Sequence, residues 1–288
     1  MRNRAYKLEE PEDMTSCVVF NSPHSGAEYP SYFLERSRLD PKAIRSSEDA
    51  YVDELFASAV QYGAPVLSAR LPRAYVDLNR SEDELDPSLV AGAPKKGVNP
   101  RIAAGLGVIP RVVGDGKSIS DRKISRYEAD RRLRLGYRPY HRQLRQLIDA
   151  QNKRHGLVIL FDCHSMPHEA LAQAPSIARS HPDIILGDRF GAACERWITE
   201  ATAEAFVAAG FTVVRNTPFA GGYITQHYGR PSHGVNAIQI EIDRSLYMDE
   251  RTMLKTPEFN GVKRRLAGVI SALAGLNRSS GAMPLAAE

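Results

Sequence analysis

The stretch 157–167, Leu-Val-Ile-Leu-Phe-Asp-Cys-His-Ser-Met-Pro, constrains the fold of this 288-residue chain most strongly. Its first five residues are all apolar, which is typical of a strand buried on both faces in a parallel sheet. Polarity then changes abruptly at Asp162 and His164, and Pro167 is expected to end the strand. Because ligands in open α/β sheets bind outside the carboxyl ends of the strands, His164 is predicted to lie where such a fold places its chemistry.

Two other segments have the same form. Residues 17–20 are apolar and run into Asn-Ser-Pro-His-Ser-Gly, which contains His24. Residues 237–240 are largely apolar and run into Glu241. Parallel strands present their carboxyl ends at one edge of a sheet, so His24, His164 and Glu241 are predicted to share one site.

Length and composition favour a single α/β domain. A hydrophobic content of 43% and a charged content of 25% are ordinary for a globular protein, and a chain of this length buries a large core. We expect one domain over residues 1–288, with a mostly parallel or mixed central sheet and helices on both faces. Residues 1–15 and 277–288 are expected to be loosely ordered.

Charge and hydropathy exclude two classes of partner. The net charge is only +4, and the basic residues are spread out apart from a local run at Arg131, Arg132 and Arg134. With no basic stripe interleaved with aromatic residues, binding to nucleic acid is not expected. No apolar run approaches the ~18 residues of a membrane span, so no membrane partner is expected either.

The cysteines are predicted to be small buried side chains, and the first residues bear on the location of the protein. Cys17, Cys163 and Cys194 are widely spaced, and no Cys-x-x-Cys pair occurs. Cys17 and Cys163 fall within or just after predicted strands, which favours small buried side chains over disulfides or nucleophiles. The first residues are too acidic and polar for a signal peptide, so we expect a cytoplasmic protein.

A helix is predicted to begin at Ser46, because Ser46 and Asp49 have the spacing of a capping box. Apolar residues then recur at helical spacing, which places Asp49 and Asp53 at the edge of a buried stripe. Asp49 has two interpretations at this stage. It is either an acid favoured by the helix dipole, or a metal ligand directed inward.

Three further features have open interpretations. Arg80, at the end of Arg-Ala-Tyr-Val-Asp-Leu-Asn-Arg, suits either a two-pronged clamp on a carboxylate or a surface salt bridge. The long segment 81–124, rich in Gly, Pro, Asp and Lys, is either a substrate loop or a plain surface excursion. His141 lies in a predicted helical region, 124–155, that Pro139 is expected to interrupt, and is either a core histidine or a substrate contact.

The candidate residues together describe metal-assisted hydrolysis. A catalytic zinc is commonly held by two histidines and one carboxylate, with an open position for water. His24 and His164 are the two best histidines, and the carboxylate would come from Glu48, Asp49 or Asp53. Glu241 is then free to act as general base towards water. Arg80, helped by Asn79, would hold the negatively charged end of an acidic amide substrate. The expected cofactor is Zn²⁺ or another divalent transition metal.

Five stretches, taken in this order over residues 18–247, resemble the N-formylglutamate amidohydrolase family: Asn-Ser-Pro-His-Ser-Gly, Glu-Asp-x-x-Val-Asp-Glu-Leu, Arg-x-Tyr-x-Asp-Leu-Asn-Arg, Asp-Cys-His-Ser-Met-Pro and Ile-Gln-Ile-Glu-Ile-Asp-Arg-Ser-Leu-Tyr. The resemblance implies a fold similar to zinc carboxypeptidases and aspartoacylases. It implies that Asn79 and Arg80 bind a carboxylate of the substrate and that Glu241 acts as the base. The implied reaction is hydrolysis of a formyl or similar small acyl amide of an acidic amino acid, such as N-formyl-L-glutamate.

One position departs from the pattern of the carboxypeptidases. They take the metal carboxylate from His-x-x-Glu, whereas Ala27 stands there in this chain and Glu28 follows it. We therefore prefer Asp49 as the third metal ligand, with Asp53, Glu48 or Glu28 in reserve. Arg244 and His141 are further candidates for substrate contacts.

Two other functions remain open from the sequence. One is a carboxypeptidase-like peptidase or amidase that acts on short peptides, and the other is a non-catalytic module that binds acidic metabolites. A serine hydrolase is disfavoured, because no Gly-x-Ser-x-Gly occurs. The sequence leaves the oligomeric state open.

Overall fold

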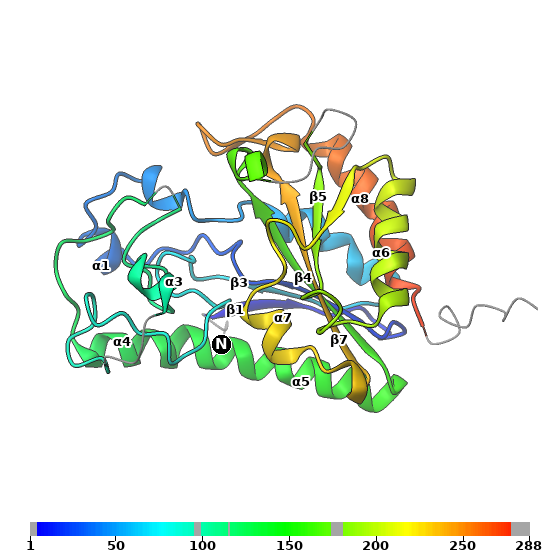
Figure 1. The fold of residues 1–288 in the computed structure, drawn as a ribbon, viewed down its shortest axis with the longest axis horizontal. Helices are drawn as coiled ribbons and strands as arrows, with labels where there is room; N and C mark the ends of the chain where they lie inside the picture. The colour runs from blue at the N-terminus through cyan, green and yellow to red at the C-terminus, as the bar shows by residue number, and fades with distance from the viewer. Residues whose placement is uncertain (1–4, 95–98, 115, 174–180, 278–288) are drawn as a thin grey trace, which may run out of the picture.

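The computed structural model describes residues 5–94, 99–114, 116–173 and 181–277. Within these residues, seven strands form one sheet in the order β1-β3-β2-β4-β7-β5-β6 (Figure 1). They are β1 (Tyr6–Glu9), β2 (Val18–Ser22), β3 (Val66–Ala69), β4 (Val158–Met166), β5 (Ile184–Gly187), β6 (Val213–Arg215) and β7 (Val235–Asp243). Two short strands, β8 (Met248–Asp249) and β9 (Leu254–Lys255), pair with each other.

The sheet is mixed, as predicted. β3, β2, β4 and β7 run parallel to one another, whereas β1 is antiparallel to β3 and β5 is antiparallel to β7. β6 closes the other edge, parallel to β5. The four central parallel strands therefore bring their carboxyl ends to one edge of the sheet, where ligands bind in folds of this kind.

Helices cover both faces of the sheet, which confirms the predicted α/β architecture (Figure 1). The α-helices are α1 (Ser31–Leu34), α2 (Val52–Phe56), α3 (Pro100–Ala103), α4 (Arg126–Arg132), α5 (Arg138–His155), α6 (Arg196–Ala208), α7 (Tyr223–Tyr228) and α8 (Phe259–Ala274). Short 3-10 turns are η1 (Ala43–Arg45), η2 (Ala57–Tyr62), η4 (His168–Gln173), η5 (Pro231–His233) and η6 (Arg244–Leu246). α2, α6 and α8 pack in one hydrophobic cluster, and α4, α5 and α7 pack in the cluster on the other face.

Strand β4 shows how the sheet holds both core and chemistry. Side chains alternate between the faces of a strand, so Ile159 and Phe161 enter the α8 cluster while Leu160 enters the α5 cluster. Further along the α5 face the residues become polar, at Asp162 and His164. The strand continues past Phe161 to Met166 and ends directly before Pro167, as expected. His164 is thus held by the sheet itself, not by a loop after it.

The segment around Asp49 differs from the prediction. No helix begins at Ser46. α2 begins only at Val52, after Tyr51 in a left-handed conformation at φ 67°. Asp49 lies in the turn before it, and its N–H donates to the carbonyl of His24 at 3.0 Å. The left-handed residue separates the turn from the helix, so the Asp49 carboxylate is directed by the turn and by its contact with the chain after β2.

Pro139 does not interrupt the predicted helix. α4 continues into α5 through a π-helical turn, η3 (Leu133–Tyr137), placed directly before the proline. In a regular α-helix, the proline ring collides with the preceding turn and removes a hydrogen bond. The wider π turn absorbs that clash, because its backbone hydrogen bonds are already displaced.

The ends of the chain also differ from the expectation in part. Within the segment 1–15, Tyr6–Glu9 forms the edge strand β1, and the Tyr6 hydroxyl donates to Gln143 Oε1 at 2.9 Å. Residues 1–4 and 278–288, which fall in the two segments expected to be loose, lie outside the described residues. Among the helices of the described ranges, none combines the length and the apolar composition needed to cross a bilayer.

Candidate active site

A cavity of about 340 Å³ opens at the carboxyl ends of the central strands. His24 follows β2, while His164 and Glu241 stand near the ends of β4 and β7, and all three line the cavity. Asp49 reaches the same space from the turn before α2. The topology therefore brings together residues that are far apart in the sequence, in agreement with the prediction that His24, His164 and Glu241 lie at one edge of the sheet.

His24, Asp49 and His164 form a compact buried cluster. Asp49 Oδ2 lies 2.8 Å from His164 Nδ1 and 3.4 Å from His24 Nδ1. One ligand atom from each residue lies within 4.8 Å of the other two. His24 Nδ1 is buried and has no hydrogen-bond partner among the described residues. A buried imidazole nitrogen left unpaired beside a carboxylate is costly unless a cation binds there, so these residues fit a divalent metal.

The far nitrogen of each imidazole is bound by a carboxylate. His24 Nε2 lies 2.8 Å from Asp77 Oδ1, and His164 Nε2 lies 3.0 Å from Asp162 Oδ2. Metal-binding histidines are typically oriented in this way, since the carboxylate keeps the proton on the far nitrogen and leaves the near one for the metal. Both rings therefore present Nδ1 to the same point.

Other polar groups hold these outer carboxylates in turn. Asp162 Oδ1 accepts from Asn21 Nδ2 at 2.7 Å, and Asn21 Oδ1 accepts from the Tyr140 hydroxyl at 2.6 Å. Asp77 Oδ2 accepts from Arg73 Nε at 3.0 Å. Each carboxylate has partners on both sides, which fixes its position.

The negative charges around His164 favour a positive charge in the cluster, which either a proton or a metal cation can supply. Burial lowers the pKa of His164, but the Asp162 and Asp49 carboxylates on either side outweigh burial and raise it well above its usual value. Burial raises the pKa of Asp49, yet the hydrogen bond with His164 and the close approach of His24 hold it well below its usual range. A cation placed between these groups would displace the proton on His164 Nδ1.

Arg244 holds the outer oxygen of Asp49. Its Nη2 donates to Asp49 Oδ1 at 3.0 Å, and its other nitrogens donate to Ser165 Oγ and to the carbonyl of Ser46. β7 ends at Asp243, so Arg244 belongs to the following turn and the alternation of a strand does not apply to it. It lines the cavity, but its guanidinium is already engaged in positioning Asp49.

Glu241 stands opposite His164 in the register of β7 and β4. Its Oε1 accepts from Gln239 Nε2 at 2.7 Å. Burial, partly offset by the positive charge of His164, raises the pKa of Glu241 to about 7. A carboxyl group with a pKa near neutrality can both accept and return a proton, which is what a general base needs.

Asn79 and Arg80 line the cavity beside this cluster but are engaged differently. The Asn79 amide nitrogen lies 3.2 Å from His164 Nε2, and its oxygen accepts from the N–H of Ile224 at 2.7 Å. Arg80 Nε donates to the carbonyl of Leu106 at 2.9 Å and Nη1 donates to that of Asn79 at 3.5 Å, which leaves Nη2 and the second hydrogen of Nη1 for a ligand. Asn79 thus supports the site, and Arg80 is placed to bind an anion.

The profile of one family covers most of the chain. It is described as N-formylglutamate amidohydrolase and matches residues 16–248. The chain belongs to this family. The N-formylglutamate deformylase of Pseudomonas putida is 29% identical over 237 residues, which are 81% of this chain and 82% of that relative. As a member of the family, the chain is a hydrolase that acts on amide bonds.

A solved structure agrees with this family assignment. The crystal structure of the N-formylglutamate amidohydrolase from Ralstonia eutropha JMP134 superposes with a TM-score of 0.87 and 33% sequence identity, covering 94% of this chain and 97% of that one. The gene product Atu2144 from Agrobacterium tumefaciens shares the fold, with a TM-score of 0.60, 20% identity and coverage of 94% of each chain.

The structure does not bring His141 to the cavity of this amidohydrolase. His141 is a partly buried residue of α5, with Nδ1 2.9 Å from the Tyr228 hydroxyl and Nε2 2.9 Å from the carbonyl of Leu78. Burial lowers its pKa to about 3, so the ring is neutral. With both nitrogens bound, His141 ties α5 to α7 and to the segment before Arg80.

The reserve ligands lie outside the cluster. Glu48 accepts from the Tyr29 hydroxyl at 2.5 Å and pairs with Arg45 at 2.9 Å. Glu28 pairs with Arg70 at 2.7 Å. Asp53 is in α2 and does not line the cavity. Of the four carboxylates considered from the sequence, Asp49 is the one in reach of both histidines.

Three residues of the site in this family member escaped the sequence analysis as site residues: Asp77, Asp162 and Arg73. Asp162 carries a signal that was available, because residues two apart on a strand share a face and Asp162 precedes His164 by two. Asp77 and Arg73 have no such local signal. The contact of Asp77 with His24, and that of Arg73 with Asp77, depend on how the segment after β3 folds back over the end of β2.

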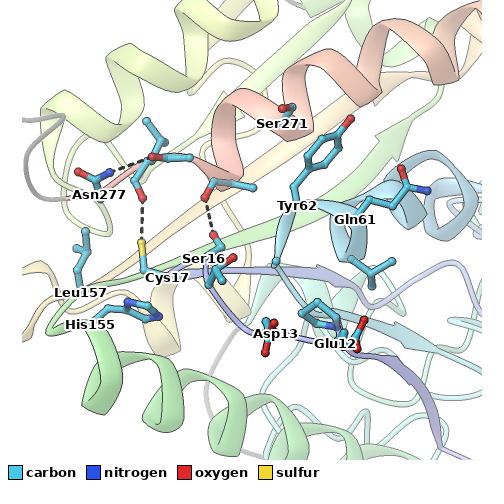
Figure 2. A pocket seen from close by; sticks show the side chains of 17 residues that line it. Glu12, Asp13, Ser16, Cys17, Gln61, Tyr62, His155, Leu157, Ser271 and Asn277 are labelled. Atoms are coloured by element: carbon cyan, nitrogen blue, oxygen red, sulfur yellow. Dashed lines mark hydrogen bonds between the residues drawn. The ribbon is translucent and has the colours of Figure 1, made fainter.

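A second cavity, of about 830 Å³, lies at the amino ends of β2 and β4, away from the candidate active site. Figure 2 shows Ser16 and Cys17 in its wall. Ser16 Oγ donates to the carbonyl of Ala274 at 2.6 Å, and Cys17 Sγ donates to that of Leu276 at 3.1 Å. These bonds join the start of β2 to the end of α8. Cys17, Cys163 and Cys194 are all buried free thiols.

Proposed function

We propose that the protein is a divalent-metal amidohydrolase that removes the formyl group, or a similar small acyl group, from an acidic amino acid such as N-formyl-L-glutamate. The names of its relatives supply the substrate class. The metal dependence is supported by one observation above all. Two histidine Nδ1 atoms and one Asp49 oxygen converge, and a carboxylate holds the far side of each ring.

His24, Asp49 and His164 would hold the ion. When bound, a zinc-type ion lowers the pKa of water and polarises the amide carbonyl. The chain's own contribution is positional. Asp77 and Asp162 keep both imidazoles aimed at one point, and Arg244 fixes the remaining oxygen of Asp49.

Glu241 would move the proton. It accepts a proton from the attacking water and returns it to the nitrogen of the departing amino acid, so formate and the free amino acid leave. Its raised pKa lets it alternate between the two states near neutral pH. Gln239, two residues earlier on the same face of β7, holds the carboxyl group by its hydrogen bond.

Arg80 would bind the α-carboxylate of the substrate. It is buried, and its Nε is anchored to the carbonyl of Leu106, so the guanidinium is held in one orientation. A fixed guanidinium suits bidentate binding of a carboxylate. The volume of about 340 Å³ is near the lower end of the range for small-molecule sites, which favours a single amino acid derivative over a peptide.

Formate release from N-formyl-L-glutamate, measured before and after removal of metal, tests the proposal. The purified protein should contain about one divalent ion per chain. A chelator should abolish formate release, and added Zn²⁺ or another divalent ion should restore it. Undiminished activity in protein shown to be free of metal would contradict the metal dependence. Activity on short peptides but not on formyl amino acids would favour the peptidase.

A further inference from the structure

Four arginines line the catalytic cavity: Arg73, Arg80, Arg101 and Arg244. Three of them face carboxylates of the site: Arg73 binds Asp77 at 3.0 Å, Arg244 binds Asp49 at 3.0 Å, and Arg80 Nε lies 3.9 Å from Asp77 Oδ2. Arg80 is anchored by Leu106 and is assigned above to one carboxylate of the substrate. Arg101 is the arginine with no role in that assignment.

The backbone of Arg101 is fixed while its guanidinium is open to solvent. It lies in α3, where the side chain of Asn99 accepts hydrogen bonds from the N–H groups of Arg101 and Ile102. Its side chain is exposed at the cavity wall. Within the described ranges, the Arg101 guanidinium has no hydrogen-bond or ion-pair partner. A cation held at the rim of a cavity without a counter-charge is available to an anionic ligand.

The long segment 81–124 supplies the wall on which Arg101 lies. Leu106, Pro110 and Val112 of this segment also line the cavity, and Leu106 is the residue that anchors Arg80. Burial lowers the pKa of Arg80, Asp77 offsets part of this effect, and the positive charges of Arg73 and Arg101 lower it further. Arg80 and Arg101 therefore act on the same region of the cavity, and a ligand with two negative charges relieves their repulsion.

We infer that Arg101 binds the side-chain carboxylate of the substrate and thereby selects N-formyl amino acids that carry two carboxylates. This assignment rests on the proposed function and makes Arg101 a specificity-determining residue. Arg80, buried and anchored, takes the α-carboxylate beside the scissile amide. Arg101, on the outer wall, takes the carboxylate at the end of the side chain.

Three substrates separate the two carboxylates. N-formyl-L-glutamate carries both, N-formyl-L-glutamine lacks only the side-chain charge, and 4-formamidobutanoate lacks only the α-carboxylate. The wild type should prefer N-formyl-L-glutamate to N-formyl-L-glutamine by about 10- to 100-fold in kcat/KM, the usual effect of a hydrogen bond to a charged group. Arg101→Ala should lose that preference by becoming slower on N-formyl-L-glutamate and on 4-formamidobutanoate, which both carry the side-chain carboxylate, and should change little on N-formyl-L-glutamine.

Arg80→Ala should show the complementary pattern. It should lose activity on both amino acid derivatives and change little on 4-formamidobutanoate. Arg122→Ala is the matched control, because Arg122 is an exposed arginine of the same segment that does not line this cavity. It should keep the wild-type preference. If Arg101→Ala slows all three substrates equally, or if the patterns of Arg80 and Arg101 are exchanged, the assignment is wrong.

Binding without turnover distinguishes a failure of this inference from a failure of the proposed function. Calorimetry on the metal-loaded protein compares glutarate with 4-carbamoylbutanoate, which differ by one carboxylate. Tighter binding of glutarate by the wild type, lost in Arg101→Ala and kept in Arg122→Ala, supports the role of Arg101 even if no formyl substrate is hydrolysed. Equal affinity of the wild type for the two compounds overturns it, whatever the activity.

Discussion

The two sides of the candidate active-site cavity differ in how completely their charged groups are partnered. On the side of the sheet, His24, Asp49 and His164 are buried, and each is held by further groups behind it. On the side of the segment 81–124, Arg101 is exposed and its guanidinium has no partner within the described residues. The sheet side holds its three side chains in one fixed arrangement. The side of the segment 81–124 presents the unpaired charge of Arg101 to a ligand in the cavity.

This difference indicates that the sheet side carries out the reaction and the outer wall selects the substrate. Groups that hold a cation or move a proton must be positioned closely, and the sheet register and buried carboxylates do this. Groups that choose among substrates need only present the right charge at the right distance. Mutations on the sheet side should therefore impair every substrate, and mutations on the outer wall should change the ranking of substrates.

The largest effect is expected from Asp49→Asn. The change keeps the shape of the side chain but removes the charge that two histidine nitrogens face. The protein should lose its metal, and kcat should fall by roughly 10³-fold or more, since a metal supplies several kcal/mol of transition-state stabilisation. Metal content per chain and formate release measure this.

Asp53→Asn is the matched control, because Asp53 lies four residues further along the chain, in α2, and does not line the cavity. It should keep both metal and activity. Full metal occupancy in Asp49→Asn would remove Asp49 from the ligand set and would show that the buried side does not work as a unit.

The next effect concerns proton transfer by Glu241. Glu241→Gln keeps the volume of the side chain and removes the base. The variant should bind metal and substrate normally, while kcat falls by roughly 10²- to 10⁴-fold, the usual contribution of a positioned base. Steady-state kinetics, with metal analysis of the same sample, measures this. Near-normal kcat together with a lowered Tm would make Glu241 a structural residue of the sheet.

A smaller effect is expected from the carboxylates behind the histidines. In Asp162→Asn, the hydrogen bond to His164 Nε2 loses its charge, and the ring is held less firmly. Metal affinity should weaken by roughly 10- to 100-fold, as for other groups that orient a ligand. Competition with a chelator of known affinity measures it. If both Asp162→Asn and Asp77→Asn kept the metal affinity of the wild type, these two carboxylates would not be needed to position the histidines.

Much of this architecture could be predicted from local sequence. The apolar runs that become polar at His24, His164 and Glu241 indicated three strand ends at one edge, and the structure places these residues around one cavity. Asp49 was predicted to lie beside His24 and His164, and it does, but the physical reason given for its position was wrong. A helix was expected to aim its carboxylate, whereas a turn before α2 does so.

The outer residues of the site could not be predicted in the same way. The contacts of Asp77 with His24 and of Arg244 with Asp49 join positions 53 and 195 residues apart. Such contacts depend on how loops fold over the sheet edge, which no local periodicity encodes. The segment 81–124 was identified as a possible substrate loop, but nothing in its sequence separates Arg101 from the other basic residues near it.

The smallest effect is expected at His168, an exposed histidine near the same edge of the sheet, and concerns stability. His168 Nδ1 lies 2.7 Å from Asp243 Oδ2, and this contact ties the turn after β4 to the end of β7. The hydrogen bond and charge of Asp243 raise the pKa of His168 above its ordinary 6.5. The stabilisation is therefore fully present below pH 6.5 and is lost as the pH rises through the raised pKa of the folded protein.

His168→Gln should lower the free energy of unfolding at pH 6 by about 0.2–1 kcal/mol, the range for an exposed ion pair. This corresponds to a fall in Tm of at most about 3 °C in a chain of this size. At a pH above the raised pKa, wild type and variant should unfold at nearly the same temperature. The exposed residue His233, which has no carboxylate partner in the part of the chain that the structure describes, provides the control His233→Gln. A difference between wild type and His168→Gln that persists unchanged at high pH would assign His168 to packing, because a lost ion pair makes the difference depend on pH.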